Sequence, residues 1–273
     1  MSPDELLAYL KNELDAFTVG SSNNYISMRA ALCPSATGLR MFDQPLIAVG
    51  DASDPLFEEL KKPDAVGQQM RLPSDWLPNA QSVISYFFPM SERVRNSNRD
   101  DGPASPEWLH ARIEGQMFIL RVGEHLQRLV RAAGYDVICP GCHPDMTATK
   151  YDGDPTVAYR SNWSERHVAY ICGLGTFSLS RGIITEKGTA GRLGSIIVSA
   201  PLPITKRNYT ELDEYCIKCG ECVDRCPVNA ISLENGKDNY LCHQQLQQTQ
   251  ELYPGYYGCG KCQVGVPCES TRP

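Results

Sequence analysis

The sequence predicts a mixed α+β protein with two parts. A domain of helices and strands over residues 1–205 precedes a bacterial ferredoxin-like module with two [4Fe–4S] clusters over residues 206–273. Two observations predict this. Eight of the 12 cysteines follow residue 215, and the segments before them alternate between helical spacing and short apolar runs of strand length. With 273 residues, the chain is long enough to bury a sizeable core.

The N-terminal third contains one clear helix and one clear strand. Leucines recur every three or four residues over 3–17, which predicts a helix, and Ser2 is a candidate N-cap. A stretch rich in Gly, Pro, Asp and Ser follows and predicts loop to about Leu77. The apolar run SVISYFF over 82–88 predicts a buried strand, and the polar residues 92–106 predict a loop.

The central third contains the longest predicted helix. Apolar residues at helical spacing over 107–133 predict one long helix or two short ones, ended by Gly134. Residues 135–138 form a short strand, and no regular period follows them. Residues 164–172 are helical in pattern, and the run SIIVSAPLP over 195–203 predicts a second strong strand.

The stretch CIKCGECVDRCP gives Cys216, Cys219, Cys222 and Cys226 with spacings of two, two and three residues, followed by Pro227. This is the bacterial ferredoxin run that holds a [4Fe–4S] cluster. Three thiolates two residues apart wrap a tight loop around one corner of a cubane. Zinc is the alternative, since CxxC pairs also build zinc ribbons.

A second set of cysteines follows, and the order of the eight predicts two clusters. In two-cluster ferredoxins the fourth cysteine of the run ligates the other cluster. The first-cluster cysteines are therefore Cys216, Cys219, Cys222 and Cys268, and the second-cluster cysteines are Cys226, Cys242, Cys259 and Cys262. The second set is more loosely spaced than the first, so the places of Cys242 and Cys268 follow from order more than from spacing.

Composition excludes several classes of protein. A net charge of −6 and a pI near 5.4 leave no basic surplus to neutralise nucleic-acid phosphates. The sequence has no apolar run of about 18 residues, so no membrane span is predicted. The N-terminal stretch is acidic and amphipathic and lacks an export signal, so a cytoplasmic location is expected, with thiols used for metal rather than disulfides.

Four cysteines lie outside the two sets. Cys139, Cys142 and His143 form a CxxCH pattern, which has four interpretations: c-type haem attachment, a redox dithiol, a third metal site that uses His143, or ordinary loop thiols. Haem attachment normally takes place outside the cytoplasm. Cys33 and Cys172 are expected to be small apolar core residues.

Three segments in order before the cysteines resemble a known family. They are LPNAQSVISYFFP over 77–89, SERHVAYICGLGTFSLS over 164–180 and LGSIIVSAPLP over 193–203. Together they resemble the epoxyqueuosine reductases and their relatives, the corrinoid-dependent reductive dehalogenases. The resemblance implies a nitroreductase-like α/β domain that holds cobalamin, with the iron–sulfur module passing electrons to cobalt. Flavin in the same pocket is the less favoured alternative.

The resemblance also implies site residues. The cofactor-binding residues would be Ser164, Gly173, Leu174, Gly175, Thr176, Phe177 and Ser178. The family's catalytic acid lies fourteen residues before the first glycine of GLG, which maps onto Tyr159, and reductive dehalogenases use a tyrosine as proton donor. Asp152 and Asp154 are nearby alternatives, although DGDP is normally a turn.

Two functions therefore stay open. One is a corrinoid-dependent reductase of a small substrate, and the other is an electron-transfer or reductive-activation protein that donates to a corrinoid protein. A low-potential donor such as ferredoxin or flavodoxin is expected as partner in either case. tRNA is not expected as a partner, because the helical repeats that follow the clusters in epoxyqueuosine reductases are lacking after Cys268 and the net charge is negative.

Overall fold

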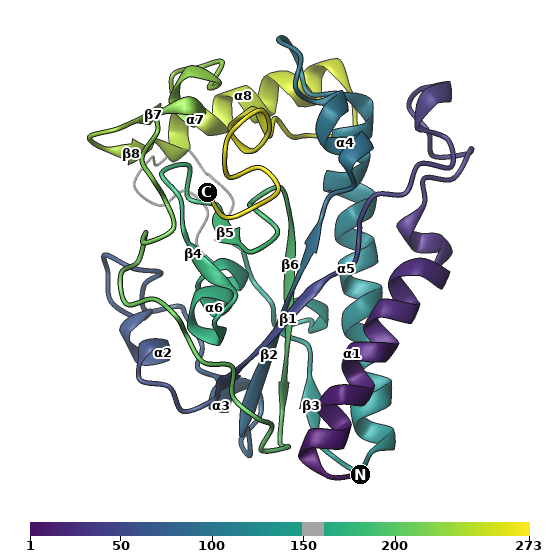
Figure 1. Ribbon diagram of the computed structural model, residues 1–273, viewed down its shortest axis with the longest axis vertical. Helices are drawn as coiled ribbons and strands as arrows, with labels where there is room; N and C mark the ends of the chain where they lie inside the picture. The colour runs from purple at the N-terminus through teal and green to yellow at the C-terminus, as the bar shows by residue number, and fades with distance from the viewer. Residues whose placement is uncertain (149–160) are drawn as a thin grey trace.

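A four-stranded antiparallel sheet forms the centre of the computed structural model, which describes residues 1–148 and 161–273 (Figure 1). Its strand order is β1 (Leu46–Asp51), β2 (Ser82–Pro89), β6 (Gly191–Val198) and β3 (Val137–Ile138). β2 is buried along its whole length, because it is a central strand with both faces covered.

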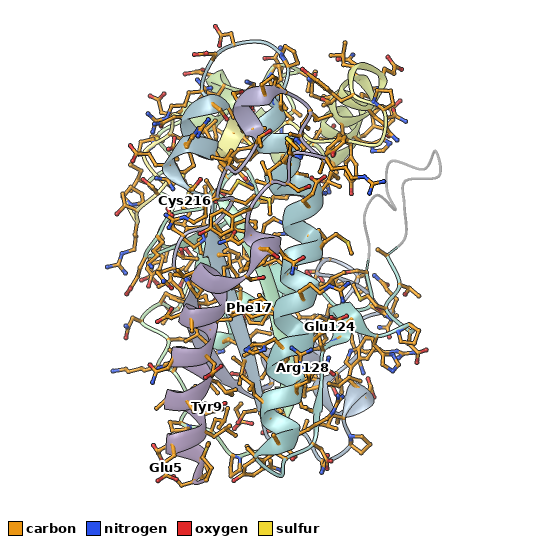
Figure 2. The ribbon with its side chains drawn as sticks, turned by 90° about the vertical axis from the view of Figure 1, so that its right-hand side faces the viewer. Glu5, Tyr9, Phe17, Glu124, Arg128 and Cys216 are labelled. Carbon is orange, nitrogen blue, oxygen red and sulfur yellow. The ribbon has the colours of Figure 1, made fainter. Side chains whose placement is uncertain are left out.

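Two long helices cover one face of the sheet. α1 (Pro3–Gly20) packs along α5 (Pro106–Ala132), and Phe17 of α1 stacks on Phe118 with ring centroids 5.9 Å apart (Figure 2). The leucine stripe of α1 is buried here, as its spacing predicts. Ser2 caps α1, accepting a hydrogen bond from the Glu5 amide in a capping box. α5 is one continuous helix.

Shorter helices cover the other face. α6 (Glu165–Cys172) lies against β1, β2 and β6, with α2 (Leu56–Glu59) and α3 (Pro73–Trp76) beside it. A second core cluster forms here, in which the rings of Phe57 and Trp163 stack with centroids 6.0 Å apart. The sheet is thus the middle layer between two apolar cores.

Two predicted loops were wrong. β1 lies within the stretch assigned as loop up to Leu77, and α4 (Glu92–Ser97) lies within residues 92–106. β1 is only six residues long and is flanked by turn-forming residues, so its identity comes from pairing with β2 rather than from local pattern. α4 is a polar helix begun by Ser91, whose hydroxyl accepts from the Val94 amide.

The cysteine-rich part lies above one end of the sheet in Figure 1 and consists of short elements. They are α7 (Glu221–Asp224), β7 (Ile231–Ser232), β8 (Gly236–Lys237), α8 (Asn239–Leu252) and the 3-10 turn η4 (Lys261–Gln263). A hairpin of β4 (Gly175–Phe177) and β5 (Ile183–Thr185) links it to the sheet domain.

The remaining 3-10 turns are η1 (Ser22–Asn24), η2 (Pro34–Ala36) and η3 (Pro140–Cys142). Over residues 1–148 and 161–273, no helix has the length and apolar character that crossing a membrane requires. The mixed helix-and-sheet architecture agrees with the predicted class. The nitroreductase-like description and the division at residue 205 stay predictions.

Candidate iron–sulfur centre and adjoining cavity

The ferredoxin run forms a compact loop followed by one helical turn. Lys218 and Gly220 adopt left-handed backbone angles between the cysteines, which lets the loop turn sharply enough for three thiols to face one centre. α7 begins directly after Gly220. Cys226 ends this segment, and its sulfur accepts from the Ala230 amide at 3.1 Å.

The first-cluster cysteines line one small cavity. Cys216, Cys219 and Cys222 come from the loop and Cys268 comes from the C-terminal segment. Burial, together with the neighbouring thiols of Cys262, Cys268, Cys216 and Cys219, raises the pKa of Cys222 to about 12. Burial and crowding thus favour protonated thiols. A bound metal cluster would reverse this preference, because metal ligation requires thiolates.

Cys268 reaches this cavity because its segment is held by the sheet domain. The Thr189 amide donates to the Cys268 carbonyl at 2.9 Å, and the Ala190 amide donates to the Glu269 carbonyl at 3.1 Å. Gly188 has a φ of +74°, and a Cβ there would lie 2.3 Å from the Glu269 carbonyl oxygen. The glycine is needed for this close approach of two backbones.

A buried carboxylate secures the same segment. Glu269 is 3% exposed and pairs with Arg95 at 3.2 Å and Arg99 at 2.7 Å. Its carboxylate also accepts from the Gly265 amide. Desolvation raises the pKa of Glu269, but the hydrogen bonds from Arg99 and Gly265 outweigh it and hold the pKa below its usual value.

The second-cluster cysteines line a different and larger cavity. Cys226 follows α7, Cys242 lies in the first turn of α8, Cys259 precedes η4 and Cys262 lies within it. The two sets of cysteines thus line two different cavities, and their assignment as ligands of two clusters stays a prediction. No three His, Cys, Asp or Glu side chains within the described ranges converge as the ligands of a single metal ion would.

The Cys259–Cys262 turn is also held by the sheet domain. The Asn98 side chain donates to the Cys259 carbonyl at 2.8 Å, and the Lys261 ammonium donates to the carbonyls of Asn98 and Asp100. Gly260 has a φ of +72° and lies against Trp108, so that a Cβ there would be 2.0 Å from the ring. Residues 98–108 thus position two of the four second-cluster thiols.

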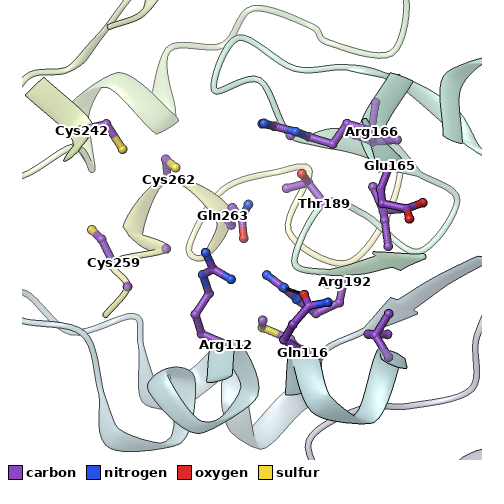
Figure 3. A pocket seen from close by; sticks show the side chains of 18 of the residues that line it. Arg112, Gln116, Glu165, Arg166, Thr189, Arg192, Cys242, Cys259, Cys262 and Gln263 are labelled. Atoms are coloured by element: carbon purple, nitrogen blue, oxygen red, sulfur yellow. Dashed lines mark hydrogen bonds between the residues drawn. The ribbon is translucent and has the colours of Figure 1, made fainter. Parts of the chain in front are cut away.

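The larger cavity measures about 710 Å³ and lies between these cysteines and the sheet domain (Figure 3). This volume is within the usual range for cofactor and small-molecule sites. α5 contributes Arg112 and Gln116, α6 contributes Glu165 and Arg166, and β6 contributes Arg192. The wall therefore combines thiols from one part of the chain with charged groups from the other.

Cations dominate the charged lining. The lining contains four cations, Arg112, Arg166, Arg192 and Lys237, and one carboxylate, Glu165. None of the ion pairs found within the described ranges involves any of these four cations. Instead, Arg192 donates to the Gln116 side chain, Arg112 donates to the Tyr257 hydroxyl at 3.3 Å, and Arg166 donates to the Arg181 carbonyl at 2.8 Å.

Three polar atoms in this wall are buried and lack a hydrogen-bond partner: Arg192 Nε, Glu165 Oε2 and Thr189 Oγ1. Burial, together with the charges of Arg112 and Arg166, lowers the pKa of Arg192 to about 9. Burial raises the pKa of Glu165 to about 7. Buried polar groups are normally satisfied, so this arrangement is typical of a binding site for an anionic ligand.

The sequence-predicted cofactor residues are divided by the structure. Ser164 lines the large cavity, and its hydroxyl lies 2.7 Å from His167 Nδ1. Ser178 lines the small cavity of the first-cluster cysteines. Gly173, Leu174, Gly175, Thr176 and Phe177 line neither cavity.

Two of those five residues, Thr176 and Phe177, hold the cysteine loop. The Tyr215 amide donates to Thr176 Oγ1 at 2.9 Å, and the Phe177 amide donates to the Leu212 carbonyl at 2.8 Å. Gly173 ends α6 with a φ of +97°, and a Cβ on Gly175 would lie 1.9 Å from the Ile184 carbonyl oxygen. Glycine is required here by the β4–β5 hairpin rather than by an approaching macrocycle.

Tyr159, Asp152 and Asp154 lie outside the described residues, so the assignment of the catalytic acid stays a prediction. The sequence analysis did not name Arg112, Gln116, Glu165 or Thr189 as site residues. Arg112 carried no local signal, because α5 has charged residues along its whole length.

Comparisons with known proteins agree with this site. Residues 212–232 match the family model of the 4Fe-4S binding domain. An epoxyqueuosine reductase of Bacillus cereus is 25% identical, in an alignment that covers 80% of this chain and 60% of that protein. The chain thus spans about three fifths of the length of this curated relative.

Two solved structures resemble the fold. A selenomethionine-labelled epoxyqueuosine reductase superposes with a TM-score of 0.54 at 18% identity, covering 97% of this chain and 64% of that one. A catabolic reductive dehalogenase in complex with 3-bromo-4-hydroxybenzoic acid gives a TM-score of 0.52 at 13% identity, covering 94% of this chain and 35% of that one. At these identities the likeness is one of fold.

Proposed function

The chain is a relative of the epoxyqueuosine reductases, and from this we propose that it is an iron–sulfur oxidoreductase. Two [4Fe–4S] clusters pass electrons to a corrinoid in the large cavity, where a small anionic substrate is reduced. One observation carries the proposal. All four second-cluster cysteines line the same cavity as three arginines and a half-buried glutamate of the sheet domain.

The order of the clusters follows from the two cavities. Cys219 is exposed, and beside it Ile217 is 58% exposed, so the first cluster would lie where a protein donor can approach. The second cluster would form part of the wall of the large cavity. Electrons from ferredoxin or flavodoxin would thus enter at the surface loop and leave at the cavity.

The residues present fit a cofactor of this kind. The cavity has cofactor size, its wall carries buried polar atoms without partners, and one side is made of thiols. Ser164, Arg166 and Arg192 would contact polar groups of a corrinoid. When bound, a corrinoid supplies a low-valent cobalt that reduces substrate. FMN is the less favoured occupant of the same space.

The arginines define the substrate class. Arg112, Arg166 and Arg192 bring positive charge to the cavity, and a carboxylate or phosphate group is the ligand that guanidinium groups bind best. tRNA is not proposed as substrate, because the net charge of −6 opposes binding of a long polyanion. A small anion avoids that repulsion by binding inside a locally positive site.

The reduction also needs a proton, and two groups are candidates. Glu165 holds a proton near neutral pH, because burial raises its pKa to about 7, and its Oε2 atom has no hydrogen-bond partner. A carboxyl group with such a pKa is suited to general acid catalysis. Tyr159 is proposed as the acid on the family resemblance alone.

A second function is electron transfer without substrate chemistry. The exposed loop around Cys219, with Ile217 and Leu212 more than half exposed, favours it, since such a surface can also deliver electrons to a partner. In that case a corrinoid protein would be the acceptor. The two functions differ in whether the large cavity itself binds a cofactor.

Anaerobic reconstitution tests the proposal. Two clusters give about eight iron and eight sulfide per chain. The protein is then incubated with hydroxocobalamin or FMN, desalted, and its visible spectrum recorded. We expect stoichiometric cobalamin retention in the wild type and a loss of retention in Arg192→Gln, with Arg121→Gln, on the outer surface of α5, as the matched control.

The outcomes separate the alternatives. Two clusters with no cobalamin retention would favour electron transfer and overturn the corrinoid part of the proposal. FMN retained instead of cobalamin would overturn it in favour of a flavin enzyme. Four iron per chain, or zinc in place of iron, would overturn the two-cluster arrangement itself.

A further inference from the structure

Cys139 and Cys142 form a thiol pair in the turn η3, directly after β3. Their sulfurs lie 2.7 Å apart, which is less than 1 Å longer than a disulfide bond of about 2.05 Å. The backbone fixes this turn, because the Cys142 amide donates to the Cys139 carbonyl at 3.0 Å. The two thiols are therefore held ready to bond without a backbone rearrangement.

The turn is packed closely against α5. Gly123 faces the pair, and a Cβ at that position would lie 2.5 Å from the Cys139 sulfur and 3.0 Å from the Cys142 sulfur. The Cys142 sulfur also contacts the Leu120 carbonyl at 3.5 Å. Because Gly123 has no side chain, α5 leaves room for both thiols on the same side of the turn.

His143 does not complete a metal site with this pair. Its Nδ1 atom accepts from the Asp145 amide at 3.2 Å, and its ring lies edge-on to Trp76 with centroids 5.7 Å apart. No trio of metal-binding side chains forms anywhere in the ranges described. The geometry therefore favours a pair of thiols that react with each other over haem attachment or a third metal site.

The two thiols differ in access and in acidity. Cys139 is 4% exposed and lines the large cavity, whereas Cys142 is half-buried and lies outside that lining. A hydrogen bond from Cys139 lowers the pKa of Cys142, and the same bond together with burial raises the pKa of Cys139. A lowered pKa and solvent access mark the attacking thiol of a dithiol pair.

We propose that Cys139 and Cys142 are a redox-active dithiol that exchanges with low-molecular-weight disulfides. The Cys142 thiolate attacks one sulfur of the small disulfide, forming a mixed disulfide and releasing one thiolate. Cys139 then loses its proton and attacks the Cys142 sulfur, releasing the second thiolate. Two electrons pass from the pair to the small disulfide, and a small dithiol reverses the reaction.

Glu165 lies close to this turn. A Cβ on Gly141, between the two cysteines, would lie 3.8 Å from Glu165 Oε1, and the charge of Glu165 contributes to the raised pKa of Cys139. The proton that Cys139 loses passes to the released thiolate or to solvent. The proposal does not depend on any cluster or ligand being bound.

Anaerobic redox titration of the cluster-loaded protein tests it directly. The protein is equilibrated with mixtures of oxidised and reduced dithiothreitol, quenched with acid, alkylated and digested with trypsin. The peptide over residues 132–150 contains these two cysteines and no others. We expect it to pass from two alkyl groups to none in a single two-electron transition, while Cys33, which is also followed by a proline, stays alkylated.

Single substitutions test the order of attack with glutathione disulfide as the probe. Cys139→Ser should accumulate a stable mixed disulfide on Cys142. Cys142→Ser should leave Cys139 unmodified or modified at least tenfold more slowly. Two alkyl groups on the wild-type peptide at every ratio would overturn the proposal, and faster modification of Cys139 than of Cys142 would overturn the assignment of the attacking thiol.

Discussion

Replacing Arg192 with methionine should make the protein more stable and its cavity a poorer anion site. Arg192 is half-buried in β6 beside Arg112 and Arg166, and no carboxylate among the described residues pairs with it. When a side chain that stabilises the fold is removed, the protein becomes less stable. When a side chain that serves a ligand is removed, the protein can become more stable, because a charge in an unfavourable environment is lost.

The magnitude follows from two opposing terms. Lowering the pKa from 12.5 to about 9 corresponds to on the order of 4 kcal/mol against the charged form, and water in the cavity screens part of this. Loss of the hydrogen bond to Gln116 costs about 1.5–3 kcal/mol. The net gain is about 1 kcal/mol, which raises the unfolding midpoint by about 2–4 °C in a chain of this size.

Anion binding should change in the other direction. One charged hydrogen bond of about 1.5–3 kcal/mol corresponds to roughly a tenfold to hundredfold loss of affinity. The assay is anaerobic thermal unfolding of cluster-loaded protein with and without inorganic phosphate. Wild type should show a phosphate-dependent rise in midpoint that Arg192→Met lacks at the same concentrations.

The control is Arg121→Met. Arg121 lies on the exposed side of α5 in a surface pair with Glu124, so this change should leave the midpoint unchanged or lower it, by at most about 2–4 °C for a surface pair worth at most about 1 kcal/mol. A lower midpoint for Arg192→Met than for wild type would refute the reasoning. Unchanged protection by phosphate would refute it equally.

Three further results are expected. Cys226→Ala should remove the cluster of Cys242, Cys259 and Cys262, leaving about four iron per chain and the signal of the first cluster. The control Cys172→Ser, in the core, should leave both clusters. Loss of the first cluster alone in Cys226→Ala would contradict the grouping. Burial raises the pKa of Glu165 to about 7, so the folded state keeps a proton that the unfolded state loses above about pH 4.5, and stability falls as pH rises between these values. The stability of Glu165→Gln relative to wild type should therefore rise over that range, by up to about 3 kcal/mol before screening. A stability difference that stays constant with pH would exclude the shift. Gly188→Ala should labilise the first cluster, because its Cβ would meet the Glu269 backbone. The control Gly134→Ala, with a similar φ of +89° and open space around it, should reduce stability only by the left-handed backbone cost of about 1–2 kcal/mol. Equal iron loss in the two variants would show that the clash has no role.

The ferredoxin run could be recognised from the sequence because ligand spacing is a local property, and residues 212–232 match the 4Fe-4S binding domain. Cys216, Cys219 and Cys222 lie in one short loop, whereas the division of the eight cysteines between two clusters stays a prediction. The apolar spacing of α1, α5 and β2 was equally informative. Each is long enough, or regular enough, for its pattern to stand above chance.

The cavity could not be predicted in the same way. Arg112, Glu165 and Arg192 come from three elements that meet only through the order of strands in the sheet, and no local signal encodes that meeting. The residues Gly173 to Phe177 show the opposite error. Their glycines were expected to admit a cofactor, whereas the structure uses them to close a hairpin and hold the loop before Cys216.

The backbone hydrogen bonds between residues 189–190 and 268–269 set an order of events during maturation. In the proposed ligand set, the fourth ligand of the first cluster would be Cys268, whose segment is held by residues between β5 and β6. Because N-terminal regions fold first during synthesis, a partly folded chain would offer only three of the four thiols. Delivery of iron and sulfide would then be productive only after the sheet domain has folded, which protects the chain from capturing an incomplete cluster early in its synthesis.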